Sequence, residues 1–246
     1  MPHRDIEDET VPFVADEPRE HRHQDDARPV SEFVGFFANV STEEAEEHER
    51  WIKQRQAEKL EAERKSALKD WESAVPENLQ ATDFDDPRLK PYSAQISRVL
   101  GWKHTPKGIY AFGRSGRGKS RSIYALARRL AVDELVPVRF LLQNEITREI
   151  NRDGVTGFLE KLDGLRRVPV LVWDDFGKFE AIGSRKGLLT AEIEALIDFR
   201  HSHGLPFLIS TNAKKEDLYE IFGRMRGEPI GRRLNECCEV VNFGWE

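Results

Sequence analysis

The fold is decided by the stretch Gly113-Arg114-Ser115-Gly116-Arg117-Gly118-Lys119-Ser120, which matches the pattern GxxxxGK[ST]. An apolar run precedes it and a helix-favouring segment follows it, which is the setting of a phosphate-binding loop. Glycines let backbone N–H groups turn inward around a phosphate, and the positive end of the following helix adds to the attraction. We expect the loop to hold a nucleotide, with Lys119 on its β- and γ-phosphates and the Ser120 hydroxyl on Mg²⁺. The bland alternative is a glycine-rich turn with an incidental lysine. Arg114 and Arg117 are additional charges in the loop, which we expect to be solvated.

On both sides of this loop, apolar runs alternate with helix-favouring stretches. Short apolar runs separated by helices indicate a parallel sheet covered on both faces. The sequence therefore predicts an α/β fold, with a five-stranded parallel sheet of the P-loop kind over residues 76–246. The expected strands cover residues 109–112, 136–142, 168–173, 207–210 and 240–243, and the expected helices cover residues 120–132, 146–162 and 188–202.

Two acidic residues follow the strand expected at residues 168–173. Carboxylates at the tip of a buried strand are costly unless a cation or a hydrogen-bond donor meets them. We predict that Asp174 holds Mg²⁺ and that Asp175 orients or deprotonates the attacking water. Because Asp175 is shorter than the glutamate found there in many ATPases, hydrolysis is expected to be slow or partner-dependent. The alternative is an ordinary turn in which the pair caps the next element.

Two more polar residues complete the expected catalytic set. Asn212 follows the apolar run at residues 207–210, where its amide would reach the γ-phosphate or the attacking water if that strand neighbours the other two. Asn at a strand end is otherwise a common turn residue. Arg233 precedes the last expected strand and is predicted to act on the nucleotide of a neighbouring subunit. Arg226 and Arg232 are alternatives for that role, and surface arginines on a helix are the bland explanation.

The N-terminal part of the chain differs in composition. Residues 1–30 are rich in acids, Pro, His and Arg and lack periodic apolar residues, which predicts a disordered acidic tail. Ser41 and Glu44 have the spacing of a capping box, and no Gly or Pro interrupts residues 42–71, which predicts a charged helix. Its apolar residues are too sparse for a core-facing stripe. Residues 31–75 are therefore either a solvated arm or an element that docks a partner. Pro76 ends the arm, and a linker with Pro87 and Pro91 is expected to follow it.

Charge is unevenly distributed along the chain. The net charge is −6, but residues 1–50 carry 15 acids and 5 bases, which leaves 29 acids and 33 bases in the remainder. The mildly basic body permits a polyanionic partner. The only cysteines are Cys237 and Cys238, which would point to opposite faces of a strand. With no leader pattern and no apolar run approaching about 20 residues, we expect a reduced, cytoplasmic protein with no membrane partner.

Taken in order, these motifs resemble those of AAA+ ATPases, and more narrowly of the DnaC/IstB family of helicase loaders and transposition helpers. The resemblance spans residues 75–246 and rests on the phosphate-binding loop, Asp174-Asp175-Phe176-Gly177, Ser210-Thr211-Asn212 and Arg233-Leu234. It implies ATP and Mg²⁺ as cofactors, a homo-oligomer in the ATP state that shares its sites between subunits, and no helical lid after the last strand.

The leading hypothesis is a replicative helicase loader from a bacterial cell or a phage-infected host. Its N-terminal arm would bind a hexameric helicase and deliver it to single-stranded DNA. Family members have a helical insertion that faces DNA, and five basic residues fall in the matching stretch here, although a solvated helix face explains them equally well. The alternatives are a transposition helper that assembles on duplex DNA, a small-molecule P-loop kinase, and an ATP-binding adaptor. The five residues are Arg148, Arg152, Lys161, Arg166 and Arg167.

Overall fold

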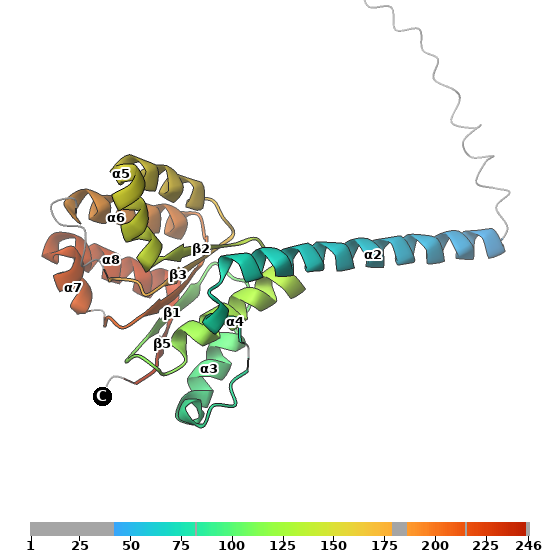
Figure 1. Ribbon diagram of the computed structural model, residues 1–246, viewed down its shortest axis with the longest axis horizontal. Coiled ribbons are helices and arrows are strands. Elements are labelled where there is room, and N and C mark those ends of the chain that lie inside the picture. The colour runs from blue at the N-terminus through green and yellow to red at the C-terminus, as the bar shows by residue number, and fades with distance from the viewer. Residues whose placement is uncertain (1–41, 82, 179–185, 215, 245–246) are drawn as a thin grey trace, which may run out of the picture. The chain divides into compact units, whose positions relative to one another are not determined.

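Five parallel strands form one sheet in the computed structural model (Figure 1), which describes residues 42–81, 83–178, 186–214 and 216–244. The strands lie side by side in the order β2-β3-β4-β1-β5. The predicted α/β class and the parallel five-stranded sheet are confirmed. The tail predicted at residues 1–30 lies outside the described residues. The strands are β1 (Gly108–Phe112), β2 (Val138–Leu142), β3 (Val170–Asp174), β4 (Phe207–Thr211) and β5 (Cys238–Asn242).

Helices cover both faces of this sheet (Figure 1). Successive strand residues point to opposite faces, so Ile109 and Ala111 join a core with α3 and α4, whereas Tyr110 packs with α5, α6, α7 and α8. Helix α4 continues into the π-helical turn η3 (Arg129–Asp133), and α5 has non-helical backbone at Gly154. The helices are α3 (Ser93–Leu100), α4 (Lys119–Arg128), α5 (Gln143–Leu165), α6 (Lys186–Ser202), α7 (Asp217–Phe222) and α8 (Arg224–Cys237).

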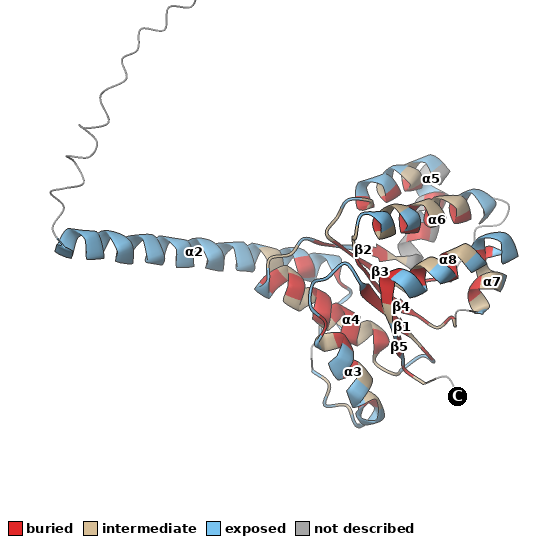
Figure 2. Cartoon of the chain, turned by 180° about the vertical axis from the view of Figure 1, so that it is seen from behind, coloured by how far each residue is buried: buried red, intermediate tan, exposed pale blue. Residues whose placement is uncertain are grey.

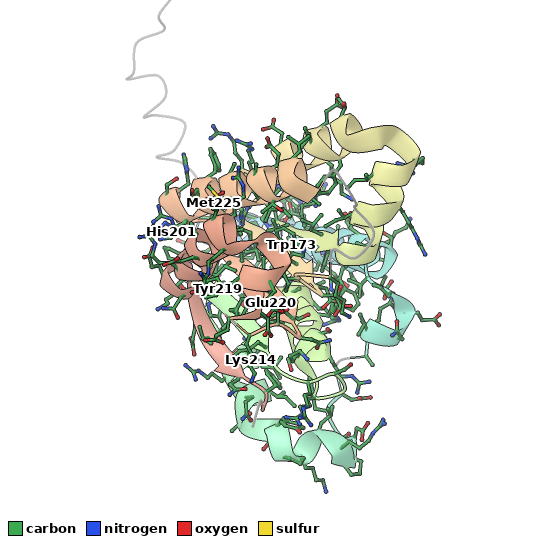
Figure 3. The ribbon with its side chains drawn as sticks, turned by 90° about the vertical axis from the view of Figure 1, so that its left-hand side faces the viewer. Trp173, His201, Lys214, Tyr219, Glu220 and Met225 are labelled. Carbon is green, nitrogen blue, oxygen red and sulfur yellow. The ribbon has the colours of Figure 1, made fainter. Side chains whose placement is uncertain are left out.

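A buried arginine ties together the segments that enter β3 and β4. Arg200 is 0% exposed, and its Nη1 donates hydrogen bonds to the carbonyls of Leu165 at 3.0 Å and Val168 at 2.8 Å, while Nη2 donates to Pro206 at 2.7 Å. Burial lowers the pKa of Arg200 to about 10, so the side chain stays charged at neutral pH. Trp173, labelled in Figure 3, lies in the same core and is fully buried. No structural role for this arginine was expected from the sequence.

Close approach of two strand backbones requires a glycine at the start of β1. A Cβ atom placed on Gly108 would lie 2.0 Å from the carbonyl oxygen of Phe207, the first residue of β4. No side chain fits there. β1 and β4 are paired neighbours, with Ile109 opposite Leu208 and Phe112 opposite Thr211. The absence of a side chain at position 108 therefore allows the register of the two strands on which the site is built.

The charged helix expected from residue 42 is α2 (Thr42–Ala74), whose side chains are mostly exposed (Figure 2). A compact unit begins at Arg55, so the last turns of α2 belong to it. In these turns Trp71 is 4% exposed and packs in a cluster with Tyr124. Arg64 Nη2 also donates a hydrogen bond to the carbonyl of Asp133 at 3.1 Å. The end of the helix is thus fixed to the body by both apolar and polar contacts.

The segment between α2 and β1 is more regular than its prolines suggested. It forms two 3₁₀ helices, η1 (Glu77–Leu79) and η2 (Pro87–Tyr92), followed by α3. The Asp86 carboxylate accepts a hydrogen bond from the backbone N–H of Arg88, which caps η2 and places Pro87 where its missing N–H costs nothing. Leu89 and Val99 are buried against α4 and the sheet. The segment is therefore one wall of the core and not a linker.

Two smaller expectations can also be compared with the structure. Cys237 ends α8 and Cys238 begins β5, so their sulfurs lie 3.8 Å apart, and the expectation of opposite faces was wrong because the pair does not lie within one strand. Both thiols are free and buried. Among the described helices, none has both the length and the apolar character needed to cross a membrane.

Candidate nucleotide-binding site at the carboxyl edge of the sheet

The glycine-rich loop joins β1 to α4 at the carboxyl edge of the sheet. Gly113, Gly116 and Gly118 have φ values of 143°, 77° and 89°, a region that residues with side chains rarely adopt. At Gly118 a Cβ atom would also lie 3.1 Å from the Leu89 side chain. The three glycines thus stand where the backbone turns, and their spacing produces the turn that the sequence predicted.

A cavity of about 410 Å³ opens over this loop. It brings the loop together with two predicted catalytic residues, Asp175 and Asn212. The segment from η1 to η2 forms another part of its wall, which the sequence did not indicate. The cavity is large enough for a mononucleotide, with the loop at one end. Its lining is Asn78, Leu79, Asp86, Arg88, Leu89, Ser115, Gly116, Arg117, Gly118, Lys119, Ser120, Arg121, Asp175 and Asn212.

Lys119 is a buried cation whose partners are loop and strand oxygens. Its Nζ donates hydrogen bonds to the carbonyls of Gly113 and Arg114, both at 2.8 Å, and to Asn212 Oδ1 at 3.0 Å. The side chain is 6% exposed, and desolvation lowers its pKa to about 8, an effect that Asp175 and Asp174 partly offset. A polyanion placed in the loop would favour the charged form. The predicted lysine and asparagine are therefore neighbours.

Asp174 lies at the tip of β3 with hydrogen-bond donors on both carboxylate oxygens. Ser120 Oγ donates to Oδ1 at 2.7 Å, and the Ser210 hydroxyl from β4 donates to the same oxygen. Tyr124 Oη donates a longer bond, 3.4 Å, to Oδ2. Asp174 and Ser120 were predicted from the sequence, whereas no role was expected for Ser210 or Tyr124. Ser210 lies in the Ser-Thr-Asn motif, two residues before Asn212. Of Ser210 and Tyr124, only Ser210 could therefore have been identified from its position in a motif.

The oxygen donors at this corner suit a magnesium ion. Mg²⁺ prefers hard oxygen ligands and is bound by one or two protein groups together with substrate phosphates and water. Ser120 Oγ and Asp174 Oδ1, already 2.7 Å apart, supply one hydroxyl and one carboxylate. Among the described residues no cluster of three or more His, Cys, Asp or Glu side chains could hold another metal. These residues fit the ion that the sequence implied.

Asp175 has a left-handed backbone, with a φ of 57°, which is uncommon for a residue with a side chain. Its backbone N–H donates to Ser210 Oγ at 3.4 Å, and its carboxylate forms an ion pair with Lys178 at 2.7 Å. Asp tolerates this conformation better than most residues because its short polar side chain can bond locally. The turn aims Asp175 into the cavity, with Lys178 as its counter-ion.

The two loop arginines, expected to be solvated, are not equivalent. Arg114 is exposed, but Arg117 is half-buried and its Nη1 donates to the carbonyl of Phe243 at 2.9 Å and to that of Gly244. The guanidinium also lies 5.2 Å from the centre of the Tyr92 ring. The expectation was wrong for Arg117, because the end of β5 passes close enough to accept these bonds.

The arginines near the C-terminus lie on α8, outside the residues that line the cavity. Arg233 Nε donates to Asp198 Oδ1 at 2.8 Å and its Nη1 to Glu236 at 3.3 Å. Arg226 bonds Glu194 at 2.6 Å, and Arg232 lies 4.0 Å from Glu236. All three have carboxylate partners within the chain. None is therefore placed to touch a nucleotide bound in the cavity of its own subunit.

Comparisons with known proteins agree with this arrangement. No protein-family model matches the chain. The replicative helicase loader DnaI of Bacillus subtilis (strain 168) is 29% identical over 155 residues, which cover 61% of this chain and 49% of the relative. Over this stretch the chain is similar to a replicative helicase loader. It matches only about half the length of that curated loader.

Two solved structures of helicase loaders have the same fold. The crystal structure of DnaI gives a TM-score of 0.50 at 22% identity and covers 68% of this chain and 94% of the other. The crystal structure of the DnaC helicase loader gives a TM-score of 0.51 at 18% identity and covers 71% of this chain and 98% of the other. At these identities the helicase-loader structures support the fold, while residue roles depend on the geometry described above.

Proposed function

We propose that this chain is an ATPase that loads a replicative helicase onto single-stranded DNA. The observation that carries the ATPase part is the convergence of three adjacent strands on one corner of the cavity. The loop after β1 brings Lys119 to 3.0 Å from Asn212 of the β4 tip, and Ser120 lies 2.7 Å from Asp174 at the tip of β3. Such convergence supplies the positioning and charge stabilisation that phosphoryl transfer requires.

Each group has a defined task in the proposed hydrolysis. The loop N–H groups and Lys119 bind the β- and γ-phosphates, and Asn212 orients the attacking water or the γ-phosphate. Asp175 accepts a proton from that water, and for this its ion pair with Lys178 has to open. Ser120 and Asp174 would hold Mg²⁺, which supplies neutralising charge on the phosphates. The closed Asp175–Lys178 pair is consistent with slow turnover until a partner acts.

The site is proposed to be completed by a second subunit. Arg233 on α8 is only partly buried and takes part in an ion-pair network. It could therefore release a carboxylate of its own chain and bind a phosphate of the nucleotide in the neighbouring subunit. An arginine supplied in trans stabilises charge on the transferring phosphoryl group. ATP would then favour a homo-oligomer, because the nucleotide bridges two protomers.

Partner surfaces are proposed on α2 and α5. Trp51 and Ile52 of α2 are 55% and 36% exposed, and an amphipathic helix presents such residues to a protein groove. On α5, Arg148 and Arg152 are exposed and would meet a DNA backbone. Arg166, in contrast, pairs with Asp163 and Glu192 within the chain. The relative's printed function, replicative helicase loading, favours a helicase over a transposase as the partner of α2.

Nucleotide binding tests the ATPase part. Calorimetry with ATP and Mg²⁺ should give binding for the native chain and a loss of at least about tenfold for Lys119→Ala, since a buried charge-assisted contact is removed. Asn212→Ala should bind ATP nearly as well but hydrolyse it slowly. Normal affinity in Lys119→Ala would refute the site.

Capture of the helicase tests the loader part. The full chain, immobilised, should retain the hexameric replicative helicase from native cell extract, and a Trp51→Ala/Ile52→Ala double variant should not. Leu188→Ala is the matched control, because Leu188 is 50% exposed on α6 and lies outside the arm. Retention of a transposase, or ATP-dependent assembly on duplex DNA without any helicase, would instead support the transposition helper.

A further inference from the structure

One tyrosine belongs both to the metal corner and to the cluster on which α2 is fixed. We define the α2 seat as the buried residues Trp71, Val75, Tyr124 and Val132. Tyr124, on α4, is 0% exposed, and its ring stacks on Phe140 with centroids 5.7 Å apart. Its hydroxyl leaves this apolar surrounding and donates to Asp174 Oδ2 at 3.4 Å. A single rigid side chain thus spans the distance between the end of the arm and the predicted magnesium ligand.

The hydroxyl matters because the other donors to Asp174 act on one oxygen only. Ser120 and Ser210 both donate to Oδ1, and Tyr124 is the donor recorded on Oδ2 within the described part of the chain. A carboxylate with a donor on each oxygen cannot rotate freely about its Cβ–Cγ bond. Groups that hydrogen-bond a metal ligand fix its orientation and are worth about 10- to 100-fold in metal affinity.

The two sides of this arrangement differ in what holds them. Ser210 lies within β4, a fully buried strand of the sheet, so its hydroxyl has a fixed origin. The Tyr124 ring is held by its packing in the α2 seat, to which α2 contributes Trp71. The guanidinium of Arg128, on α4, lies 6.0 Å from the centre of the Trp71 ring. Trp71 and Tyr124 pack in one buried cluster, so a shift of the indole ring changes the packing around the tyrosine ring. A change at the end of α2 therefore reaches Asp174 through Tyr124.

We propose that Tyr124 is a positioning residue that orients Asp174 and makes metal binding depend on how the end of α2 packs. The proposal rests on the proposed function, in which Asp174 holds Mg²⁺. It adds a route by which a protein bound to α2 regulates the nucleotide site of the same subunit. Binding of a partner protein to the arm would change the affinity of the site for the metal ion. By linkage, binding of the ion would change the affinity of the arm for its partner.

The first test removes the hydroxyl and keeps the ring. Mn²⁺ binding to the full chain, saturated with a non-hydrolysable ATP analogue, is measured by electron paramagnetic resonance for the native protein and Tyr124→Phe. We expect roughly three- to tenfold weaker Mn²⁺ binding, which is less than the usual 10- to 100-fold effect because the bond is long. Affinity for the analogue without metal should not change.

Tyr110→Phe is the matched control for this variant. Tyr110 is 5% exposed, and its hydroxyl donates to the carbonyl of Ala213 at 3.2 Å, so a buried hydroxyl is lost that does not donate to Asp174. It should lower the melting temperature about as much as Tyr124→Phe but leave Mn²⁺ binding unchanged. Native Mn²⁺ affinity in a folded Tyr124→Phe variant, or the same loss in both variants, would overturn the proposal.

The second test addresses the connection to α2 with a double-mutant cycle. Trp71→Ala should weaken Mn²⁺ binding by about threefold in the native background and have no further effect in Tyr124→Phe, since both act through one hydroxyl. Trp71→Phe replaces Trp71→Ala should the latter unfold. Trp102→Phe, a substitution at a buried indole in the other core, is the control and should have no effect. Equal losses in both backgrounds, or none at all, would refute the connection.

These results separate the inference from the function on which it rests. A native chain that binds no nucleotide analogue would refute the proposed ATPase, and the inference would fall with it. A native chain that binds analogue and metal normally, beside an unaffected Tyr124→Phe variant, would refute the inference alone.

Discussion

The contact between Arg117 and the end of β5 predicts a measurable loss of stability in Arg117→Met. The change removes the hydrogen bonds to the carbonyls of Phe243 and Gly244 and the cation–π contact with Tyr92. For a half-buried guanidinium each bond to a carbonyl contributes about 1 kcal/mol, and the contact with the ring about 0.5–1 kcal/mol. The free energy of unfolding should therefore fall by about 2–3 kcal/mol.

Thermal unfolding of the nucleotide-free chain measures this loss. A protein of this size loses about 2–4 °C of melting temperature per kcal/mol, so we expect a drop of about 5–10 °C. The melting temperature of Arg117→Lys should lie between those of the native chain and Arg117→Met, since an ammonium group lacks the flat guanidinium that lies over the Tyr92 ring. Arg88→Met is the control, because Arg88 lines the same cavity but pairs only locally, with Asp86 at 2.7 Å, and should stay within about 1 °C. Equal melting temperatures for Arg117→Met and Arg88→Met would refute the reasoning.

Two further predictions concern buried cations. Burial lowers the pKa of Lys119 from 10.5 to about 8, so the unfolded chain keeps this proton to a higher pH than the folded chain does. The free energy of unfolding of the nucleotide-free protein, relative to that of Lys119→Met, should therefore rise between about pH 8 and pH 10.5. ATP binding in that window should take up a proton, which calorimetry in buffers of different ionisation enthalpy detects; no uptake would contradict the lowered pKa. Arg200→Met leaves buried carbonyls unpaired and should lower the free energy of unfolding in urea by about 3–5 kcal/mol. Arg98→Met removes an exposed ion pair with Glu239 and should lower it by less than about 1 kcal/mol. A similar cost for both would show that Arg200 is not a structural tie.

The sequence predicted those parts of the site that depend on local patterns. A glycine-rich loop between a strand and a helix has one common use, and a polar residue at the end of an apolar run marks a strand tip. These rules identified Lys119, Ser120, Asp174 and Asn212, which the structure brings together through the strand order β3-β4-β1. The roles assigned to Asp175 and Arg233 stay predictions, because each needs a bound nucleotide or a second subunit.

What the sequence missed depends on contacts between distant segments. Tyr124 reads as an ordinary core residue of α4, and only the fold brings its hydroxyl to Asp174, 50 positions away. Arg117 likewise reads as a solvated charge until β5, more than 120 residues later, passes beside it. The segment with Pro87 and Pro91 was interpreted as a linker, although Pro87 begins a short helix and Leu89 is buried. Hydrophobic periodicity indicates which face of a helix or strand is buried, but it does not indicate which other element covers that face.

The bare backbone at Gly108 has a consequence for genetics. The spacing of the β1 and β4 tips, where the proposed site lies, depends on how closely the two strands run at their other ends, where even a methyl group would collide with the Phe207 carbonyl. A screen for inactive alleles should therefore recover substitutions at the foot of the sheet, five residues before the glycine turn, as readily as in the turn itself. Such substitutions would increase the separation of the two strands. Second-site substitutions that only restore charge near the phosphates should therefore not restore activity.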